Sequence, residues 1–393
     1  MIREEVYMRS AQRWRVASIT CLGRGSRRKT GLGLAMRVWV MAGVAISMFL
    51  AGCGGSSSDY QQQPTPPFTP MPSTACGGGS AVHTGPAGPS PVGTPGVTAR
   101  WAASDNYQIT INATDQPKLY LTYSDDFKPS WSETGAMLTY FHALHYGNTF
   151  DQWKTGLCVI HADGTQATAL SNGAYADFNP TWTRDGTNQI IFNRYAVSGS
   201  TSNDIYLISP QGTVGSEVLV STPGNGYEWA FSGLKDGRIF IDRVDWSTGQ
   251  AVASSFLLTP NPGGTPTYEE ITRPILATQL WQKLSVSPSE TKVTYMLDGN
   301  GDMSSYNDDV LYYADFDVNT RVVSNPVAFT TYDLSQISEY PSWSADESLI
   351  IYDSNRSGVY QTYAYNPADG STTVLSDDAT VNFQFADFEN LPK

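Results

Sequence analysis

The sequence predicts an all-β fold, a six-bladed β-propeller of four-stranded antiparallel blades. The stretch at 129–135, Pro-Ser-Trp-Ser-Glu-Thr-Gly, returns at 180–186 as Pro-Thr-Trp-Thr-Arg-Asp-Gly and at 341–347 as Pro-Ser-Trp-Ser-Ala-Asp-Glu. Each copy is followed by a short run of β-branched, aromatic and other apolar residues, as at 190–192 and 349–352. No apolar period of 3.6 residues persists over three turns, so we expect no helix.

Five copies of this repeat fill roughly residues 126–378. With the Trp as reference, the equivalent positions are Trp131, Trp182, Phe231, Val286 and Trp343, at intervals of 51, 49, 55 and 57 residues. On this alignment the third copy carries a two-residue insertion before Asp236. A period of about 40–60 residues made of four short strands is typical of a propeller blade.

The second copy illustrates the four strands, A to D, of one blade. Strand A ends near Trp182, and strands B, C and D are expected at 189–193, 204–209 and 217–221. The last copy repeats this pattern at 348–353, 359–365 and 372–375. Asp-Gly pairs mark the turns between strands.

The two ends of the domain together predict the sixth blade. Residues 379–388 form a lone strand A, and residues 97–103, 107–113 and 118–123 form three strands without one. Strands from both termini would therefore close the ring. Closure removes the exposed sheet edges that an open stack would leave.

Residues 1–52 are predicted to be a lipoprotein signal segment, with the true start at Met36 or, alternatively, a long basic leader before it. The apolar run 38–50 is too short to span a bilayer but fits a secretory signal. The sequence at 50–53, Leu-Ala-Gly-Cys, resembles the lipobox of bacterial lipoproteins. That resemblance implies cleavage before Cys53 and lipid attachment to its sulfur, the alternative being an ordinary signal peptide with an incidental cysteine.

Residues 53–96 are predicted to be a disordered tether, followed by the propeller domain at 97–393. Residues 54–96 carry nine Pro and nine Gly, and Asp59 is their only charge, so this segment buries too little apolar surface to offset its ordering entropy. Gly54 and Gly55 follow Cys53 where an Asp would favour inner-membrane retention. We therefore expect a lipid anchor in the outer membrane, facing the periplasm or the cell surface.

The charge balance argues against nucleic acid as a partner. The first 52 residues hold nine of the 24 basic and two of the 37 acidic residues, so the remaining chain keeps 15 basic and 35 acidic residues, a net charge of −20. Such a surface repels phosphate backbones and anionic lipid, so the lipid anchor has to hold the protein at the membrane. In an exported chain Cys76 and Cys158 can form a disulfide, or Cys158 can be a small buried apolar residue.

The repeat resembles that of the periplasmic TolB family. Residues 341–347 with 349–358, and residues 180–186 with 190–194, carry the resemblance, which covers about 290 residues. The same repeat occurs in prolyl-oligopeptidase-like peptidases. It implies the propeller fold and leaves function open. A tether replaces the α/β domain of TolB, TolB is not a lipoprotein, and no convincing Gly-x-Ser-x-Gly nucleophile elbow occurs.

The polar B–C loops at 142–155, 194–203, 298–308 and 353–358 are the predicted binding surface, because loops on one propeller face usually bind. The repeated Trp residues are expected to pack between blades. The candidate binding residues are His142, His145, Tyr146, Trp153, Asn193, Arg194, Asn355 and Arg356.

Asp298, Asn300, Asp302 and Asp309 have the spacing of oxygen ligands in a calcium loop. Met303 stands where such a loop has its turn glycine, and the final ligand is Asp where Glu is usual. A polar hairpin tip is the alternative interpretation. We expect no other cofactor.

No catalytic residue is assigned, since the four His residues form no Ser-His-Asp or Cys-His set in the sequence. The leading hypothesis is a lipid-anchored protein of the cell envelope that acts as a non-catalytic binding or scaffold protein for a protein or glycan partner. The alternative is a carbohydrate-active enzyme, a lyase or glycosidase, that uses the loop face.

Overall fold

The structure, a computed structural model, describes fourteen parts of the chain, all within one compact unit that includes residues 69–393. These parts are residue 76 and residues 83–84, 100–105, 108–113, 119–122, 125–145, 154–195, 203–221, 226–245, 252–274, 281–298, 309–333, 335–376 and 383–388. They contain β-strands and no α-helix, which confirms the predicted all-β class. No helix in these parts is long and apolar enough to cross a membrane.

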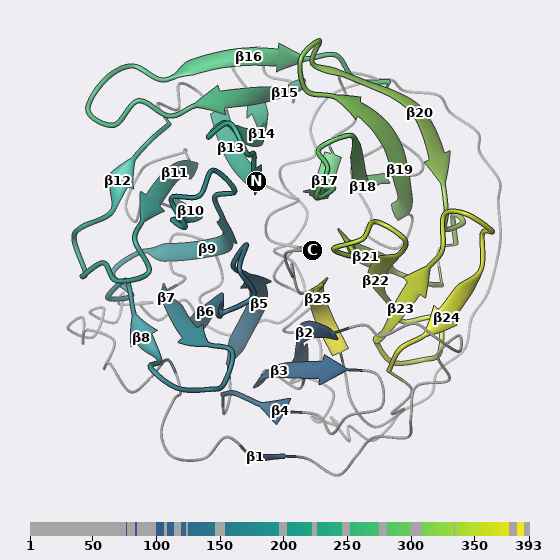
Figure 1. Cartoon of the computed structure of the whole chain (residues 1–393), viewed down its shortest axis with the longest axis horizontal. Coiled ribbons are helices and arrows are strands. Elements are labelled where there is room, and N and C mark those ends of the chain that lie inside the picture. Colours follow the sequence, from purple (N-terminus) through teal and green to yellow (C-terminus); the bar gives the residue numbers. More distant parts are fainter. Residues whose placement is uncertain are drawn as a thin grey trace, which may run out of the picture. The chain divides into compact units, whose positions relative to one another are not determined.

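Three consecutive groups of four strands form antiparallel meanders (Figure 1). The first comprises β5 (Asp126–Trp131), β6 (Met137–His145), β7 (Lys154–His161) and β8 (Thr168–Ala169). The second comprises β9 (Ala176–Trp182), β10 (Ile190–Tyr195), β11 (Asn203–Ile208) and β12 (Val218–Leu219). The third comprises β13 (Gly226–Gly233), β14 (Ile239–Asp245), β15 (Val252–Thr259) and β16 (Thr267–Ile271).

Two further meanders follow, and the remaining sheet joins both ends of the domain. The fourth meander comprises β17 (Trp281–Val286), β18 (Lys292–Asp298), β19 (Asp309–Asp317) and β20 (Val322–Ala328). The fifth comprises β21 (Ser338–Trp343), β22 (Ile350–Ser354), β23 (Gln361–Tyr365) and β24 (Thr372–Val374). The last sheet has the order β1-β4-β3-β2-β25. Its strands are β1 (His83–Thr84), β2 (Arg100–Asp105), β3 (Gln108–Ala113), β4 (Leu119–Tyr120) and β25 (Phe383–Phe388).

In each meander the first strand lies nearest the middle of the view in Figure 1, and in the last sheet β25 does. Among these inner strands β5 contacts β9, β9 contacts β13, β13 contacts β17, β17 contacts β21, β21 contacts β25, and β25 contacts β5. The later strands of each meander lie progressively farther out. The inner strands therefore bring residues from distant parts of the chain to one shared space.

Gly233, and not Phe231, is the structural equivalent of the repeated Trp in the third copy. Gly233 pairs with Ile239, the first residue of β14, as Trp182 pairs with Ile190, the first residue of β10. The spacing on either side of Trp182 then becomes 51 residues, and the predicted two-residue insertion disappears. A Cβ on Gly233 would lie 2.6 Å from the carbonyl oxygen of Trp182, so this position tolerates no side chain.

The Trp side chains pack between neighbouring sheets, as the sequence predicts. Trp182 lies in one apolar cluster with Leu157 and Val159 of the preceding sheet and with Ile190 of its own. The other two, at 131 and 343, are also almost fully buried, each in a cluster that joins two sheets. These contacts fix the lateral packing of the sheets.

The described structure extends upstream of residue 97, into the segment predicted to be a tether. Strand β1 pairs with β4, and the sulfurs of Cys76 and Cys158 form a disulfide, with an S–S distance of 2.10 Å. Cys76 is fully buried in the apolar cluster that contains Trp131, and its carbonyl oxygen accepts a hydrogen bond from the Tyr140 hydroxyl. The disulfide attaches this upstream segment to the first meander.

Candidate functional site

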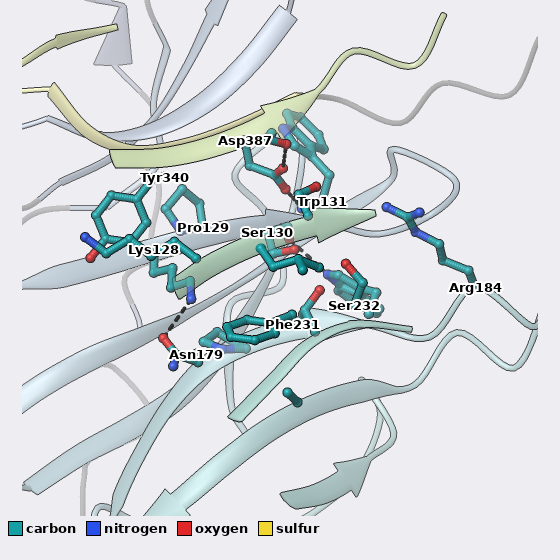
Figure 2. Close-up of a pocket in the computed structure, with 18 of the residues that line it drawn as sticks. Lys128, Pro129, Ser130, Trp131, Asn179, Arg184, Phe231, Ser232, Tyr340 and Asp387 are labelled. Carbon is teal, nitrogen blue, oxygen red and sulfur yellow. Dashed lines mark hydrogen bonds between the residues drawn. The ribbon is translucent and has the colours of Figure 1, made fainter. Parts of the chain in front are cut away.

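A cavity of about 350 Å³ lies among the inner strands (Figure 2). Its lining comes from β5, β9, β13, β17, β21 and β25 and from the turns that follow the first five of these strands. We number its residues from the reference positions Trp131, Trp182, Gly233, Val286 and Trp343, with Phe388 as their counterpart on β25. Most lining residues then fall into three sets, at positions −3, −1 and +2 of the repeat.

The −3 set consists of Lys128, Asn179, Ala230, Lys283 and Tyr340. Four of these residues have a left-handed backbone, with φ between 51° and 57°, and the pairing of their strands shifts at the same place. This conformation costs a non-glycine residue about 1–3 kcal/mol, which the surrounding sheet has to supply. The resulting β-bulge re-aims the side chain, here toward the cavity.

The −1 set consists of Ser130, Thr181, Ser232, Ser285, Ser342 and Asp387. Five hydroxyl side chains and one carboxylate thus occupy equivalent positions on six strands. Asp387 accepts a hydrogen bond from the Trp131 backbone N–H at 3.0 Å and another from the Ser342 hydroxyl at 2.7 Å. Burial raises the pKa of Asp387, and these two hydrogen bonds oppose that rise.

The +2 set lies in the turns at one end of the cavity and consists of Glu133, Arg184, Lys235, Pro288 and Ala345. Arg184 donates from Nη1 to the carbonyl oxygens of Val286 and Ser287, at 3.0 and 3.2 Å. Burial lowers the pKa of Arg184, while nearby carboxylates, Glu290 foremost, oppose that shift. These turn residues form the mouth of the cavity.

Two lysines of the −3 set carry positive charge into the cavity. The Lys128 ammonium donates to the side-chain oxygen of Asn179 at 2.7 Å, and Figure 2 shows both groups at the end of the cavity opposite Arg184. Burial, and to a smaller extent the charge of Lys283, lower the pKa of Lys128 to about 7, against the opposing charge of Asp387. Lys283 forms an ion pair with Glu339 and lies over the Tyr340 ring, 3.9 Å from its centre.

The predicted loop residues Asn193 and Arg194 lie inside the fold. Asn193 is fully buried and joins two sheets, because its amide donates to the carbonyl oxygen of Glu228 at 2.9 Å. Arg194 is nearly buried and forms ion pairs with Asp177 and Glu217 at 2.6 and 2.5 Å. These contacts occupy both side chains, so we do not place them in the candidate site.

The remaining loop predictions lie away from the cavity lining or outside the described residues. His142 is hydrogen-bonded through Nδ1 to Asp126 at 2.9 Å. The side chain of His145 and all of Tyr146 and Trp153 lie outside the described residues. A binding role for these loop positions stays a prediction.

Asn355 and Arg356 lie in the described turn between β22 and β23. The Asn355 side-chain oxygen accepts a hydrogen bond from the Ile337 backbone N–H at 2.7 Å. Arg356 is exposed, and its guanidinium lies 4.4 Å from the centre of the Tyr363 ring. Arg356 therefore remains accessible as a candidate contact on this turn.

The predicted calcium loop is only partly described. Asp298 pairs with Asp309 where β18 meets β19, and Asp309 is almost fully buried. Asn300, Asp302 and the side chain of Asp298 lie outside the described residues. Within the described parts of the chain no three His, Cys, Asp or Glu side chains gather as metal ligands. The calcium prediction thus stays untested.

The sequence contains a signal for the cavity outside the loops that are predicted to bind. Lys128, Asn179 and Tyr340 each precede the proline of their repeat, and these three residue types differ completely in chemistry. A position that varies this much inside an otherwise regular repeat is under no common packing demand. When the third copy is aligned on Gly233, the residues of the +2 set show the same variation in residue type.

No family model matches the sequence, and no curated protein matches it. Among solved structures, the chain is similar to TolB from Acinetobacter baumannii, with 13% identity, a TM-score of 0.53, and coverage of 74% of this chain and 66% of that one. It is also similar to hydrazine synthase from Kuenenia stuttgartiensis, with 13% identity, a TM-score of 0.55, and coverage of 76% and 48%.

At these identities the likeness concerns the fold alone. The chain spans just under two thirds of TolB and about half of the hydrazine synthase chain. The fold is therefore a TolB-like β-propeller, as the repeat predicts.

Proposed function

We propose that this TolB-like propeller is a non-catalytic binding or scaffold protein of the cell envelope, and that its partner, a protein or a glycan, engages the mouth of the cavity. The observation that carries the proposal is the cavity of about 350 Å³, lined by repeat positions −3, −1 and +2. This volume lies at the small end of the range of ligand pockets, about 300–1,000 Å³. The cavity would hold one protruding group of a larger partner.

The proposal includes a closed ring of six blades. The cycle of contacts among β5, β9, β13, β17, β21 and β25 supports it, as does the sheet in which β25 joins β2 to β4. In such a ring all inner strands line one axial channel, so that one residue from each blade reaches the same level. The −1 set has this arrangement, with one member on each of the six strands.

The hydrogen bonds of the carboxylate in the −1 set support a structural role for it. Asp387 accepts the Trp131 N–H through Oδ2 and the Ser342 hydroxyl through Oδ1. With both oxygens engaged, Asp387 serves to join β25 to β5 and β21. No described feature favours the alternative of a carbohydrate-active enzyme.

The location remains the one predicted from the sequence. The lipobox-like residues 50–53 and most of the Pro- and Gly-rich segment that follows them lie outside the described residues. We propose lipid attachment at Cys53 in the outer membrane, which would hold the propeller near envelope partners. Envelope proteins and glycans are the partner classes that such an anchor makes accessible.

The test is capture of partners from solubilised envelopes by the full-length chain and by two tryptophan variants. Ala345→Trp fills the mouth, because Ala345 is half-buried in the +2 set. Ala368→Trp places the same side chain on an exposed turn between β23 and β24. We expect a partner that is retained by wild type and Ala368→Trp and lost with Ala345→Trp. Equal retention by both variants would place the binding surface elsewhere.

A further inference from the structure

We infer that the cavity binds an organic carboxylate with an apolar body, and that the carboxylate lies between the ammonium groups of Lys128 and Lys283. This inference rests on the proposed function, because it names the chemistry of the group that enters the cavity. A free small acid and the C-terminal carboxylate of a polypeptide share that chemistry.

The two lysines approach the cavity from opposite directions. Lys128 lies on β5 and Lys283 on β17, and two inner strands separate them along either half of the contact cycle. Both occupy position −3, so they lie at the same level of their strands, and the left-handed backbone at φ 52° and 51° aims both inward. An anion between them would interact favourably with both charges at once.

Lys128 is the less compensated of the two cations. Among the described residues its ammonium has no carboxylate within 4.0 Å, and its hydrogen-bond acceptor there is the neutral amide oxygen of Asn179. A bound carboxylate would replace this neutral acceptor by a charged one. Charge-assisted hydrogen bonds are about twice as strong as neutral ones.

The walls provide both polar and apolar contacts for the rest of the ligand. Ser285, two residues after Lys283 on β17, and Ser232 on β13 also line the cavity and offer hydroxyl groups, which suit the second oxygen of a carboxylate, whereas the Ser130 hydroxyl is hydrogen-bonded to Asp387. The rings of Phe231 and Tyr340 also line the cavity (Figure 2). Aromatic walls beside a cationic pair favour a carboxylate attached to an apolar group over a small hydrated anion.

The local charge contrasts with that of the chain as a whole, which has a formal net charge of −13. The charges that act on Lys128 are those of Lys283 on β17 and Asp387 on β25; Arg184, Lys235 and Glu133 lie at the mouth, and Glu339 is ion-paired with Lys283. Four of these seven groups, Lys128 included, are cations. Burial keeps the pKa of Lys128 near 7, so a bound anion would raise this pKa and draw a proton to Lys128.

Calorimetric titration of the full-length chain with benzoate tests the inference. Benzamide, which has the same ring without the charge, is the matched ligand. We expect one benzoate site, at least tenfold weaker binding of benzamide, and at least tenfold weaker benzoate binding by Lys128→Met. Titrations in two buffers of different ionisation enthalpy give the number of protons that the complex takes up on binding. Benzoate binding should take up close to one proton at pH 8 and almost none at pH 6.

Two further variants keep the test decisive. If Lys128→Met fails to fold, Lys128→Gln replaces it in the benzoate titration. Lys292→Met removes a lysine that is ion-paired with Asp315 on the outside of the sheet, and should change benzoate affinity less than twofold. Equal affinity for benzoate and benzamide, or unchanged benzoate affinity after loss of the Lys128 charge, would overturn the inference.

A second pair of ligands distinguishes the two sources of carboxylate. Tighter binding of N-acetyl-Ala-Phe than of benzoate, lost on amidation of the peptide, would indicate a polypeptide C-terminus, and the reverse order a free acid. Either order supports the inference. If benzoate fails to bind while Ala345→Trp still abolishes partner capture, the carboxylate inference falls and the binding function stands.

Discussion

The Cα of Gly233 lies against the backbone of Trp182, so closely that a Cβ would be 2.6 Å from the Trp182 carbonyl oxygen and 2.7 Å from the Cα of Thr183. Gly233 ends β13, and Trp182 ends β9 of the preceding sheet. In the other copies the same position carries Trp or Val. The third meander therefore packs backbone to backbone against the second, and glycine is what permits this approach.

Gly233→Ala should destabilise the protein by about 1–3 kcal/mol, because the methyl group forces two packed strands apart. Urea unfolding measures the change in the free energy of unfolding. Gly186→Ala is the matched control: Gly186 has φ of 80° and open space around its Cα, so its cost of about 1–2 kcal/mol is local backbone strain. A neutral Gly233→Ala would contradict the close packing of β13 on β9.

Lys128→Met should stabilise the protein most at acidic pH. Lys128 has a pKa of about 7 in the folded chain, against about 10.4 when unfolded, so between these values unfolding takes up a proton and wild-type stability rises with pH. The variant removes the free-energy penalty of keeping a charged Lys128 in the folded chain. This penalty is complete below pH 7 and vanishes toward pH 10.4. We expect a gain on the order of 2 kcal/mol at pH 6, after loss of the Asn179 hydrogen bond.

Urea unfolding of wild type and Lys128→Met at pH 6, 8 and 10 provides the measurement. Lys292→Met, whose exposed ion pair with Asp315 contributes little, is the control and should show a difference that barely depends on pH in this range. A gain for Lys128→Met that stays constant from pH 6 to pH 10 would mean that Lys128 titrates normally.

Asp387→Ala should cost about 1–3 kcal/mol, because it leaves the buried N–H of Trp131 without its acceptor. Asp387→Asn keeps one acceptor oxygen and should cost less. Thermal unfolding compares the two variants. If Ala and Asn are equally tolerated, Asp387 does not join β25 to the neighbouring strands, and the proposed closure loses its main side-chain contact.

The repeat pattern predicts the strands well, whereas the prediction of binding on the loops misses the cavity. Alternation and turn residues locate strands such as β10 and β22, because half-buried strands leave a local period. The repeat pattern predicts the third reference position at Phe231, an aromatic residue like the Trp of the other copies, whereas the fold requires Gly233 there. The close approach of two backbones depends on tertiary packing, and no local sequence pattern indicates it.

The −3 set was missed for a related reason. Lys128 and Asn179 look like ordinary surface residues next to a proline, and only the β-bulge turns them toward the cavity. Position −1 looked like part of a turn motif, yet its hydroxyl groups converge from strands distant in sequence. The loop residues Tyr146 and Trp153, on which the sequence placed binding, lie outside the described residues and remain a prediction.

Cys53→Ala should release the protein from the membrane fraction, because the acidic surface of the remaining chain offers no attraction to anionic lipid. Fractionation of cells followed by immunoblotting measures the distribution. Ser56→Ala, three residues beyond Cys53, is the matched control and should leave the protein with the membranes. An unchanged distribution for Cys53→Ala would rule out the lipid anchor.

Site-specific photocrosslinking in intact cells tests most directly whether partners bind at the mouth of the cavity. A photoreactive phenylalanine is placed at Ala345 in the mouth, at Arg356 on the turn between β22 and β23, and at Ala368 on an outer turn as the control. The proposed function predicts a discrete adduct from position 345 and none from position 368. An adduct from position 356 in the absence of one from position 345 would contradict it and assign binding to the loops.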